Sequence, residues 1–366
     1  MNLHIIQGLG IGGAENVFIR IVEKHVISNN ARIICILGCS EDKANVELLV
    51  SLGFKVNKIF NIKTSEYSWT FRIINALSFL FAPIVACYIL VRTPRVAKLY
   101  THMPLATYIG VCIKMMRKIS GSNTVLVDTF HTNWYLLKFY YKFLFYLFHR
   151  FCDTILVEMG IEEADKFRIR YPNVAIYYLP FYSLYLNGDY SLLKNFSKPI
   201  QLLAPMRITF HEKPIEIILD GFLQSKLCNN NDYQLNFVGG GKDFEKLKIL
   251  VENSNCFNIK LYGSDPELSK SYVKFDLCLA GLGNNELGIA AIESFNNGMG
   301  VVGIGLGEVS DDIVLETIKS TNEMVILFNS LLKPDVMSDI FNKTSVFFKK
   351  KVSEGVDFSI YKELYN

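Results

Sequence analysis

The feature that most constrains the fold of this chain is a regular alternation of short apolar runs with segments of helical periodicity. Strands that are apolar along their length and separated by helices are typical of a parallel sheet covered on both faces. The pattern therefore predicts an α/β fold. In the first half we expect strands at 3–7, 31–37, 54–60, 96–102, 124–131, 153–159 and 174–180, with helices between them such as 13–28 and 105–119.

The alternation stops at residues 186–199 and then starts again. With 366 residues the chain also exceeds the size of one comfortable core. We therefore predict two successive α/β domains, residues 1–190 and 191–349. In the second domain we expect strands at 200–206, 234–241, 258–263, 276–281 and 300–305.

The charge is unevenly distributed, although the net charge is only +3. Residues 55–150 contain 13 basic residues and two acidic ones, Glu66 and Asp128, whereas the second half is acidic overall. This asymmetry indicates contact between one domain and an anionic surface; the alternative is a basic face with no partner. The basic residues are interleaved with apolar segments and match no nucleic-acid-binding pattern, so we expect no nucleic acid partner.

One apolar segment reaches the length of a membrane span. Residues 73–91 carry no charge and are flanked by Arg72 and Arg92. Because Pro83 interrupts this run, a buried helix or a helix on a membrane surface is favoured over a true span. The aromatic residues and lysines of 134–148 favour attachment to an anionic membrane surface.

The eight cysteines are scattered, mostly in apolar runs, and none forms a C-x-x-C pair. They are typical of reduced thiols in a cytosolic protein. The first residues lead directly into an expected strand rather than into a signal peptide. We therefore expect a cytoplasmic protein, peripheral at the inner face of the cytoplasmic membrane.

A glycine-rich loop follows the first expected strand. Gly8, Gly10 and Gly13 fit the G-x-G-x-x-G pattern of dinucleotide-binding folds. Those folds carry an acidic residue at the end of the second strand to bind ribose, and here the strand 31–37 ends in glycine, cysteine and serine. An NAD(P)-dependent oxidoreductase is therefore the weaker alternative. The loop does offer free N–H groups to an anion or a sugar.

Cations and further glycines stand where strands of the second domain are expected to end. Arg207 and Lys213 can clamp a pyrophosphate and stabilise it as it leaves; the alternative is that they are ordinary loop cations. Gly239–Gly241 follow the next strand, where bare backbone can approach a nucleotide. The turn at 281–288 precedes a helix in which Glu293 can bind ribose hydroxyls.

In this order, the motifs resemble retaining glycosyltransferases of the GT-B fold, the family-four group that includes bacterial lipopolysaccharide and capsule enzymes. The resemblance covers nearly the whole chain. It implies two Rossmann-like domains with parallel sheets that face each other across a cleft, the first for the acceptor and the second for the nucleotide-sugar. It also implies a C-terminal helix, at about 350–366, that packs back on the first domain. It depends on GGAENVFIRIV, TFHTNW, the Arg207 to Lys213 pair, FVGGG, KLYG and ELGIAAIESFNNGMGVV.

The resemblance also implies a role for each candidate site residue. His131 would contact the transferred sugar near the reacting centre, and Arg207 and Lys213 would hold the diphosphate; we predict these three as catalytic. His102 is a weaker candidate, for which a structural role is equally expected. The predicted donor-binding residues are Gly12, Gly13, Gly239, Gly240, Asn285, Glu286, Leu287, Gly288 and Glu293.

One position departs from the family pattern. Asn285 stands eight residues before Glu293, where the E-x7-E motif has its first glutamate, and Glu286 is one position late. Either Asn285 or Glu286 could take the role of that glutamate, which contacts the sugar. The departure also motivates the alternative of a sugar-nucleotide-binding subunit without turnover.

The expected reaction transfers a sugar from a UDP- or GDP-linked donor to an acceptor hydroxyl with retention. The expected context is synthesis of bacterial surface polysaccharide, O-antigen or capsule, on a lipid-linked or glycan acceptor. We expect no cofactor and no metal, because the chain has no D-x-D motif at the expected cleft and no H-E-x-x-H motif, and its six histidines do not cluster.

Overall fold

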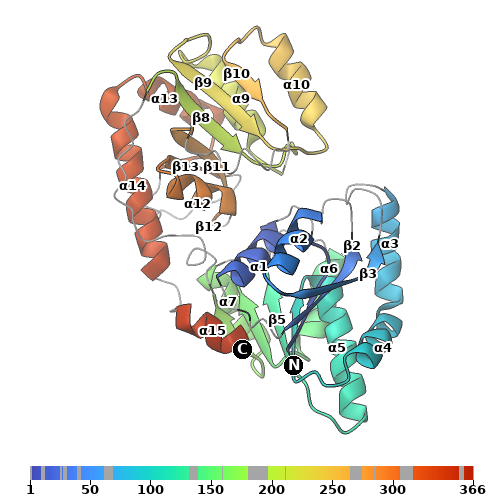
Figure 1. Ribbon diagram of the computed structural model, residues 1–366. Coiled ribbons are helices and arrows are strands. Elements are labelled where there is room, and N and C mark those ends of the chain that lie inside the picture. The colour runs from blue at the N-terminus through green and yellow to red at the C-terminus, as the bar shows by residue number, and fades with distance from the viewer. Residues whose placement is uncertain are drawn as a thin grey trace. The chain divides into compact units, whose positions relative to one another are not determined.

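The chain divides into two compact units (Figure 1). Unit 1 comprises residues 1–184 and 355–366, and unit 2 comprises residues 185–354. The computed structural model describes residues 2–9, 13–24, 27, 31–38, 43–61, 69–131, 139–158, 160–179, 197–210, 212–263, 274–283, 286–305, 316–353 and 358–365.

Unit 1 is built on a parallel sheet with the strand order β3-β2-β1-β4-β5-β6-β7. This doubly wound order places β1 beside β4, and the connections that follow these two strands diverge at their carboxyl ends. The seven apolar runs expected in the first half all form strands. Their bounds are β1 (Asn2–Ile6), β2 (Arg32–Gly38), β3 (Lys55–Asn61), β4 (Lys98–His102), β5 (Val125–Phe130), β6 (Thr154–Val157) and β7 (Ala175–Tyr178).

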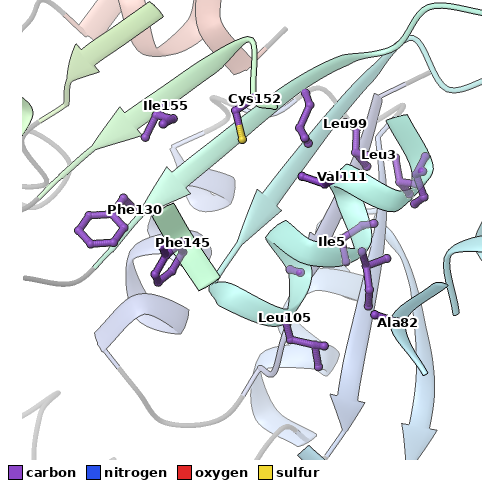
Figure 2. Close-up of a cluster of buried hydrophobic side chains, with 14 of the residues drawn as sticks. Leu3, Ile5, Ala82, Leu99, Leu105, Val111, Phe130, Phe145, Cys152 and Ile155 are labelled. Atoms are coloured by element: carbon purple, nitrogen blue, oxygen red, sulfur yellow. The ribbon is translucent and has the colours of Figure 1, made fainter. Parts of the chain in front are cut away.

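Helices α4, α5 and α6 contribute apolar side chains to the core over one face of this sheet (Figure 2). Side chains alternate between the faces of a strand, so Leu3 and Ile5 of β1 face this core together with Leu99 of β4. The expected helix 13–28 ends earlier, at Glu23. The helices of unit 1 are α1 (Gly13–Glu23), α2 (Lys43–Ser51), α3 (Trp69–Leu80), α4 (Ala82–Arg92), α5 (Pro104–Ile119), α6 (Phe139–His149), α7 (Ile161–Arg170) and α15 (Phe358–Tyr365).

The uncharged segment 73–91 forms parts of two helices rather than one. Ile73–Leu80 and Ala82–Arg92 are bent by 73° relative to each other. In the part of the chain that the structure describes, no single helix is long and apolar enough to cross a membrane, although this bent pair passes that test together by length and composition.

The C-terminal helix α15 belongs to unit 1. The ring of Tyr365 is fully buried and stacks on Tyr100 of β4, with 5.4 Å between the ring centroids. The Tyr100 hydroxyl donates a hydrogen bond to the carbonyl of Leu364 at 2.8 Å, and the hydroxyls of Tyr365 and Thr129 are 3.1 Å apart. The end of the chain is therefore part of the core of unit 1.

Unit 2 repeats the same strand order on a second parallel sheet, β10-β9-β8-β11-β13-β14, with β12 paired antiparallel to β11. Its strands are β8 (Ile200–Pro205), β9 (Tyr233–Val238), β10 (Ile259–Leu261), β11 (Leu277–Gly283), β12 (Glu286–Leu287), β13 (Gly300–Gly305) and β14 (Thr317–Ile318). Its helices are α9 (Ile215–Gln224), α10 (Phe244–Asn253), α12 (Ile289–Asn296), α13 (Thr321–Ser330) and α14 (Pro334–Ser353).

Candidate functional site

A row of polar side chains crosses four neighbouring strands of unit 1. His4 lies in β1, His102 ends β4, His131 follows β5 and Glu158 follows β6. His131 Nδ1 lies 2.6 Å from Glu158 Oε2, and His131 Nε2 lies 3.1 Å from His102 Nδ1. A longer contact of 3.5 Å joins His102 Nε2 to His4 Nδ1. The expectation that the histidines do not cluster is therefore wrong, because the strand order brings together residues that are far apart in the sequence.

The three rings hold protons unequally. Burial lowers the pKa of His4 to about 3, and burial with the charges of His131 and His4 lowers the pKa of His102 well below its ordinary value. Burial also lowers the pKa of His131, but the charge and hydrogen bond of Glu158, with more distant carboxylates, outweigh it and raise that pKa overall. His131 therefore holds a proton most readily, and when charged it donates N–H groups to Glu158 and to neutral His102.

The row lies inside the protein. The side chain of His131 is 4% exposed and that of Glu158 is 1% exposed. Glu158 Oε1 is buried and has no hydrogen-bond partner among the described residues. In this arrangement both ring nitrogens of His131 are engaged, so a contact between His131 Nε2 and a sugar would require it to leave His102. The sugar contact of His131 stays a prediction.

Helix α1 packs against this row. The ring of Phe18 meets His102 edge to face at 4.8 Å between centroids, and the buried Glu15 contributes to the raised pKa of His131. Gly13 is the first residue of α1, whereas the predicted donor-binding Gly12 lies outside the described residues. The structure therefore places the start of the helix after the first glycine loop next to the histidines.

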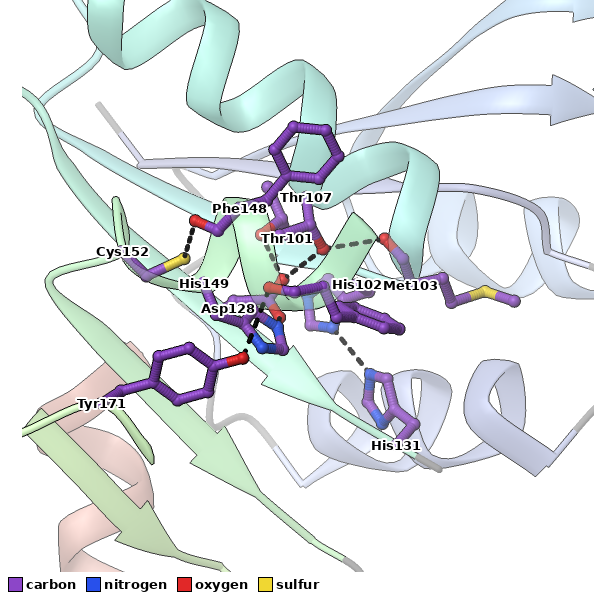
Figure 3. A network of polar contacts seen from close by, with 11 residues as sticks. Thr101, His102, Met103, Thr107, Asp128, His131, Phe148, His149, Cys152 and Tyr171 are labelled. Carbon is purple, nitrogen blue, oxygen red and sulfur yellow. Dashed lines mark hydrogen bonds and ion pairs between the residues drawn. The ribbon is translucent and has the colours of Figure 1, made fainter. Parts of the chain in front are cut away.

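A second buried cluster surrounds Asp128 on the opposite face of β5 (Figure 3). Asp128 Oδ1 accepts hydrogen bonds from the hydroxyls of Thr101 at 2.5 Å and Thr107 at 2.7 Å. Asp128 Oδ2 lies 2.8 Å from Nε2 of His149, which ends α6. This carboxylate therefore ties β4, β5, α5 and α6 together. Sequence reasoning missed this cluster, and also missed Glu158 and His4.

The connection from β4 to α5 is strained beside the histidine row. Met103, which follows His102, has a φ of +80°, which is uncommon for a residue other than glycine. Its carbonyl accepts a hydrogen bond from the backbone N–H of Thr107 at 3.1 Å, and the hydroxyl of Thr107, which donates to Asp128, lies 3.0 Å from the same carbonyl. Strained residues of this kind are concentrated at functional sites, and this one lies where the connections that follow β1 and β4 diverge.

In unit 2, two of the predicted catalytic residues lie on the connection between β8 and α9. Arg207 and Lys213 are both exposed. The pKa of Lys213 is lowered because protein atoms crowd and desolvate its ammonium group, and because the guanidinium of Arg207 repels it. The two cations therefore share one region, and an anion bound there would relieve their repulsion.

The glycine loop after β9 packs directly on the segment that carries Arg207. A Cβ atom on Gly239, whose φ is +147°, would lie 2.1 Å from the carbonyl oxygen of Met206, and one on Gly241 would lie 2.2 Å from that of Ile208. The backbone N–H of Ile208 donates to the carbonyl of Gly240 at 2.9 Å. Contact between two loops thus explains these glycines, and an approach of Gly239 and Gly240 to a nucleotide stays a prediction.

The turn into α12 brings four more of the predicted donor-binding residues to the same sheet. Gly288 caps the N-terminus of α12 with open space beside its Cα, and Leu287 is buried. Glu286 pairs with Gly283 of β11, and Glu293 lies half-buried within α12. Asn285 lies outside the described residues.

The end of β11 also reaches the connection that carries Lys213, because a Cβ atom on Gly281 would lie 3.4 Å from Cδ of Pro214. The loops after β8, β9 and β11 therefore lie at one edge of the sheet. Among the described residues, no group of three or more histidine, cysteine, aspartate or glutamate side chains is placed to hold a metal ion.

No protein-family model and no curated protein sequence matches this chain. Its fold does match solved structures over almost the full length of both chains. The lipopolysaccharide outer core galactosyltransferase WaaB has a TM-score of 0.61 at 16% identity, with 100% of this chain and 98% of that chain covered. Anabaena HepE in complex with UDP-glucose has a TM-score of 0.67 at 15% identity, with 100% and 98% covered. The pneumococcal O-GlcNAc transferase GtfA in complex with UDP and GlcNAc has a TM-score of 0.64 at 11% identity, with 100% and 97% covered. With its two parallel-sheet α/β domains, the chain has the GT-B fold of these glycosyltransferases.

Proposed function

We propose that this chain is a retaining glycosyltransferase, similar to the family-four group, that uses a nucleotide-diphosphate sugar. The observation that carries the proposal is the pair of mutually repelling cations, Arg207 and Lys213, at the carboxyl edge of a parallel sheet. Ligands of doubly wound sheets bind at this edge. The proposal is also supported by the printed descriptions of structural neighbours, which include a galactosyltransferase and a complex with UDP-glucose.

The donor diphosphate binds between these two cations in our proposal. Its negative charge offsets the desolvation and the repulsion by Arg207 that together lower the pKa of Lys213, so the ammonium keeps its proton. The ribose hydroxyls bind Glu293, and the sugar binds Asn285 or Glu286. We favour a UDP-linked donor over a GDP-linked one because HepE and GtfA were solved with UDP or UDP-glucose.

The proposed reaction breaks the bond between the anomeric carbon and the diphosphate oxygen. Negative charge then develops on the leaving diphosphate, where Arg207 and Lys213 stabilise it. The acceptor oxygen bonds to the anomeric carbon on the face that the diphosphate leaves, and its proton passes to the departing phosphate oxygen. The two cations provide the positive charge in this scheme, so we propose that no metal takes part and that a chelator leaves the rate unchanged.

His131 contributes a positioned charge in this proposal, and Glu158 is its positioning residue. The short contact between His131 Nδ1 and Glu158 Oε2 fixes the plane of the ring and favours its protonated form. In the proposal, the positive charge of a protonated His131 attracts the electronegative oxygen atoms of the transferred sugar. His102 supports this arrangement as the neutral acceptor of the second N–H.

The proposed context is synthesis of bacterial surface polysaccharide, O-antigen or capsule, with a lipid-linked or glycan acceptor at the inner face of the cytoplasmic membrane. The description of WaaB supports it. The second candidate function is a sugar-nucleotide-binding subunit without turnover, and the asparagine at position 285 favours it.

A thermal-shift series with UDP, GDP, ADP, CMP, CDP and NAD(P) tests the donor assignment. We expect UDP to raise the melting temperature more than GDP does, and Arg207→Ala to abolish the shift. A shift with NAD(P) alone would instead support an oxidoreductase. Release of nucleotide diphosphate in the presence of extracted lipid acceptors then separates the enzyme from the subunit, which binds donor but does not turn it over.

A further inference from the structure

Helix α4 carries apolar side chains on both of its faces, but only one face packs into the core. Val85 and Ile89 on the inner face are buried. On the outer face, Ile84 is 65% exposed and Val91 is 81% exposed, and Tyr88 between them is also exposed. A helix on the surface of a globular protein normally carries polar residues on its outer face. The outer face of α4 therefore lacks the composition of a solvated surface.

Helix α5 extends this apolar face. It packs along α4, where Cys87 Sγ and Met116 Sδ are 3.7 Å apart. Near its end, Met115 is exposed and Ile119 is 88% exposed. Contiguous exposed apolar side chains on two packed helices mark an interaction site rather than scattered surface residues. We define the α4–α5 surface as Ile84, Tyr88, Val91, Met115 and Ile119.

Basic side chains lie at the end of the α4–α5 surface where both helices terminate. Arg92 lies with its guanidinium 5.1 Å from the centroid of the Tyr88 ring, and Arg95 and Lys118 are exposed nearby in the chain. Arg117 joins the two helix ends through a hydrogen bond of 2.7 Å to the carbonyl of Pro94. Between Glu66 and Asp128 the sequence has no acidic residue, and Asp128 is buried. The charged side chains of α4 and α5 are therefore all positive and form a positive rim at this end of the surface, where Asp153 pairs with Lys114 of α5 at 2.7 Å.

We propose that the α4–α5 surface docks this protein on an anionic lipid membrane. Apolar and aromatic side chains enter the boundary between headgroups and acyl chains, while the arginines and lysines at the helix ends attract anionic headgroups. A second copy of the chain fits this surface less well, because pairing two such faces brings two positive rims together. This proposal goes beyond glycosyl transfer and does not rest on it.

Co-sedimentation of the full chain with lipid vesicles tests the proposal. We expect binding to vesicles of phosphatidylglycerol and phosphatidylcholine, much weaker binding to phosphatidylcholine alone, and loss of binding as salt is raised. The double variant Ile84→Asp/Val91→Asp removes two apolar side chains from the surface and should bind at least about tenfold more weakly. It should keep its fold, because both side chains are exposed. The matched control is Ile326→Asp on α13, where Ile326 is 68% exposed, and it should bind like the wild type.

Two further measurements test the roles of the basic side chains and of self-association. Replacing Arg92 and Lys118 by glutamate should remove the preference for anionic vesicles while circular dichroism stays unchanged. The proposal fails if the wild type does not sediment with anionic vesicles, or if the double variant binds as the wild type does. It also fails if the double variant instead converts a dimer into a monomer, which would make the surface an interface between copies. Turnover with a soluble acceptor is expected to persist in the double variant. Failure of the membrane proposal can therefore be distinguished from failure of the proposed glycosyl transfer.

Discussion

The two units have the same order of strands, but they hold their charged and titratable groups in different places. Unit 1 buries His4, His102, Asp128 and Glu158 within its fold. Unit 2 carries Arg207 and Lys213 on an exposed connection at the edge of its sheet. Its buried polar side chains are mostly uncharged, with Asp276 as a carboxylate among them: the amide nitrogen of Asn258, for example, lies within hydrogen-bond distance of three backbone carbonyls.

This difference predicts different consequences for substitution. A buried polar group that loses its partner costs free energy of folding, because its partner is left without a hydrogen bond away from water. An exposed loop cation makes little contribution to folding, so its removal changes ligand binding alone. Variants of unit 1 should therefore change both stability and activity, whereas variants of the unit 2 cations should change activity only.

The largest expected effect is the loss of transfer in Arg207→Ala and Lys213→Ala. Removing one preorganised cation from a leaving diphosphate should reduce turnover by at least about a hundredfold, or about 3 kcal/mol. Steady-state release of nucleotide diphosphate measures this effect, and urea unfolding should show unchanged stability. Lys242→Ala is a matched control, because Lys242 is an exposed lysine on a neighbouring loop, 3.5 Å from Glu212. Full activity in either cation variant would contradict the assignment of the exposed unit 2 cations to the leaving diphosphate.

The sequence predicts the elements of the unit 2 site better than those of the unit 1 clusters. Arg207, Lys213 and the glycines are recognisable because they interrupt the chain where apolar runs end. Glu158 falls inside the apolar run 153–159 and looks like part of a strand. Its partner, His131, is 27 residues away, and His4 is 98 residues from His102. Only the strand order shows that these positions meet.

The strand order itself can be predicted in part from the sequence. A doubly wound sheet places its first strand beside its fourth, so a polar residue in β1 is expected near the end of β4. The stretch LHII carries such a residue, His4. The partners of Asp128 are harder to predict from the sequence, because Thr107 and His149 lie on helices whose rotation about their axes depends on how the core packs.

The next largest effect is expected at Asp128, whose two oxygens serve three side chains. Asp128→Ala leaves the Thr101 hydroxyl and His149 Nε2 without their acceptor, whereas the Thr107 hydroxyl can turn to the carbonyl of Met103. We expect a loss of about 3 kcal/mol in the free energy of unfolding. Asp128→Asn keeps an oxygen for both threonines and should lose less. Urea unfolding measures both values. Equal stability of Asp128→Ala and wild type would show that the buried cluster does not support unit 1.

A smaller effect is expected at Glu158, which acts through His131. Glu158→Gln removes the charge that raises the pKa of His131, so the limb of the pH–rate profile that reports this histidine should move to lower pH. Turnover near neutral pH should fall by about tenfold, while KM for the donor stays close to that of the wild type. Glu162→Gln, on the exposed first turn of α7, is the control. A fall in stability with an unmoved pH profile would mean that Glu158 is structural only.

The smallest expected effect is on the pH dependence of folding stability, to which His4 of unit 1 contributes. The pKa of His4 is about 3 in the folded protein, below its ordinary 6.5, so the folded state takes up a proton less readily than the unfolded state. The stability that neutral His4 contributes is therefore complete above about pH 6.5 and is lost as the pH falls from there towards 3. His4→Phe keeps an aromatic ring against Tyr100 and removes this titration, so at about pH 5.5 it should lose about 1 kcal/mol less stability than the wild type does. Tyr100→Phe is the control, because burial raises the pKa of Tyr100 and its phenol does not titrate in this range. Urea unfolding at about pH 5.5 and above about pH 6.5 measures this loss of stability. An equal loss in His4→Phe and in the wild type would show that buried His4 does not make the stability of unit 1 sensitive to acid.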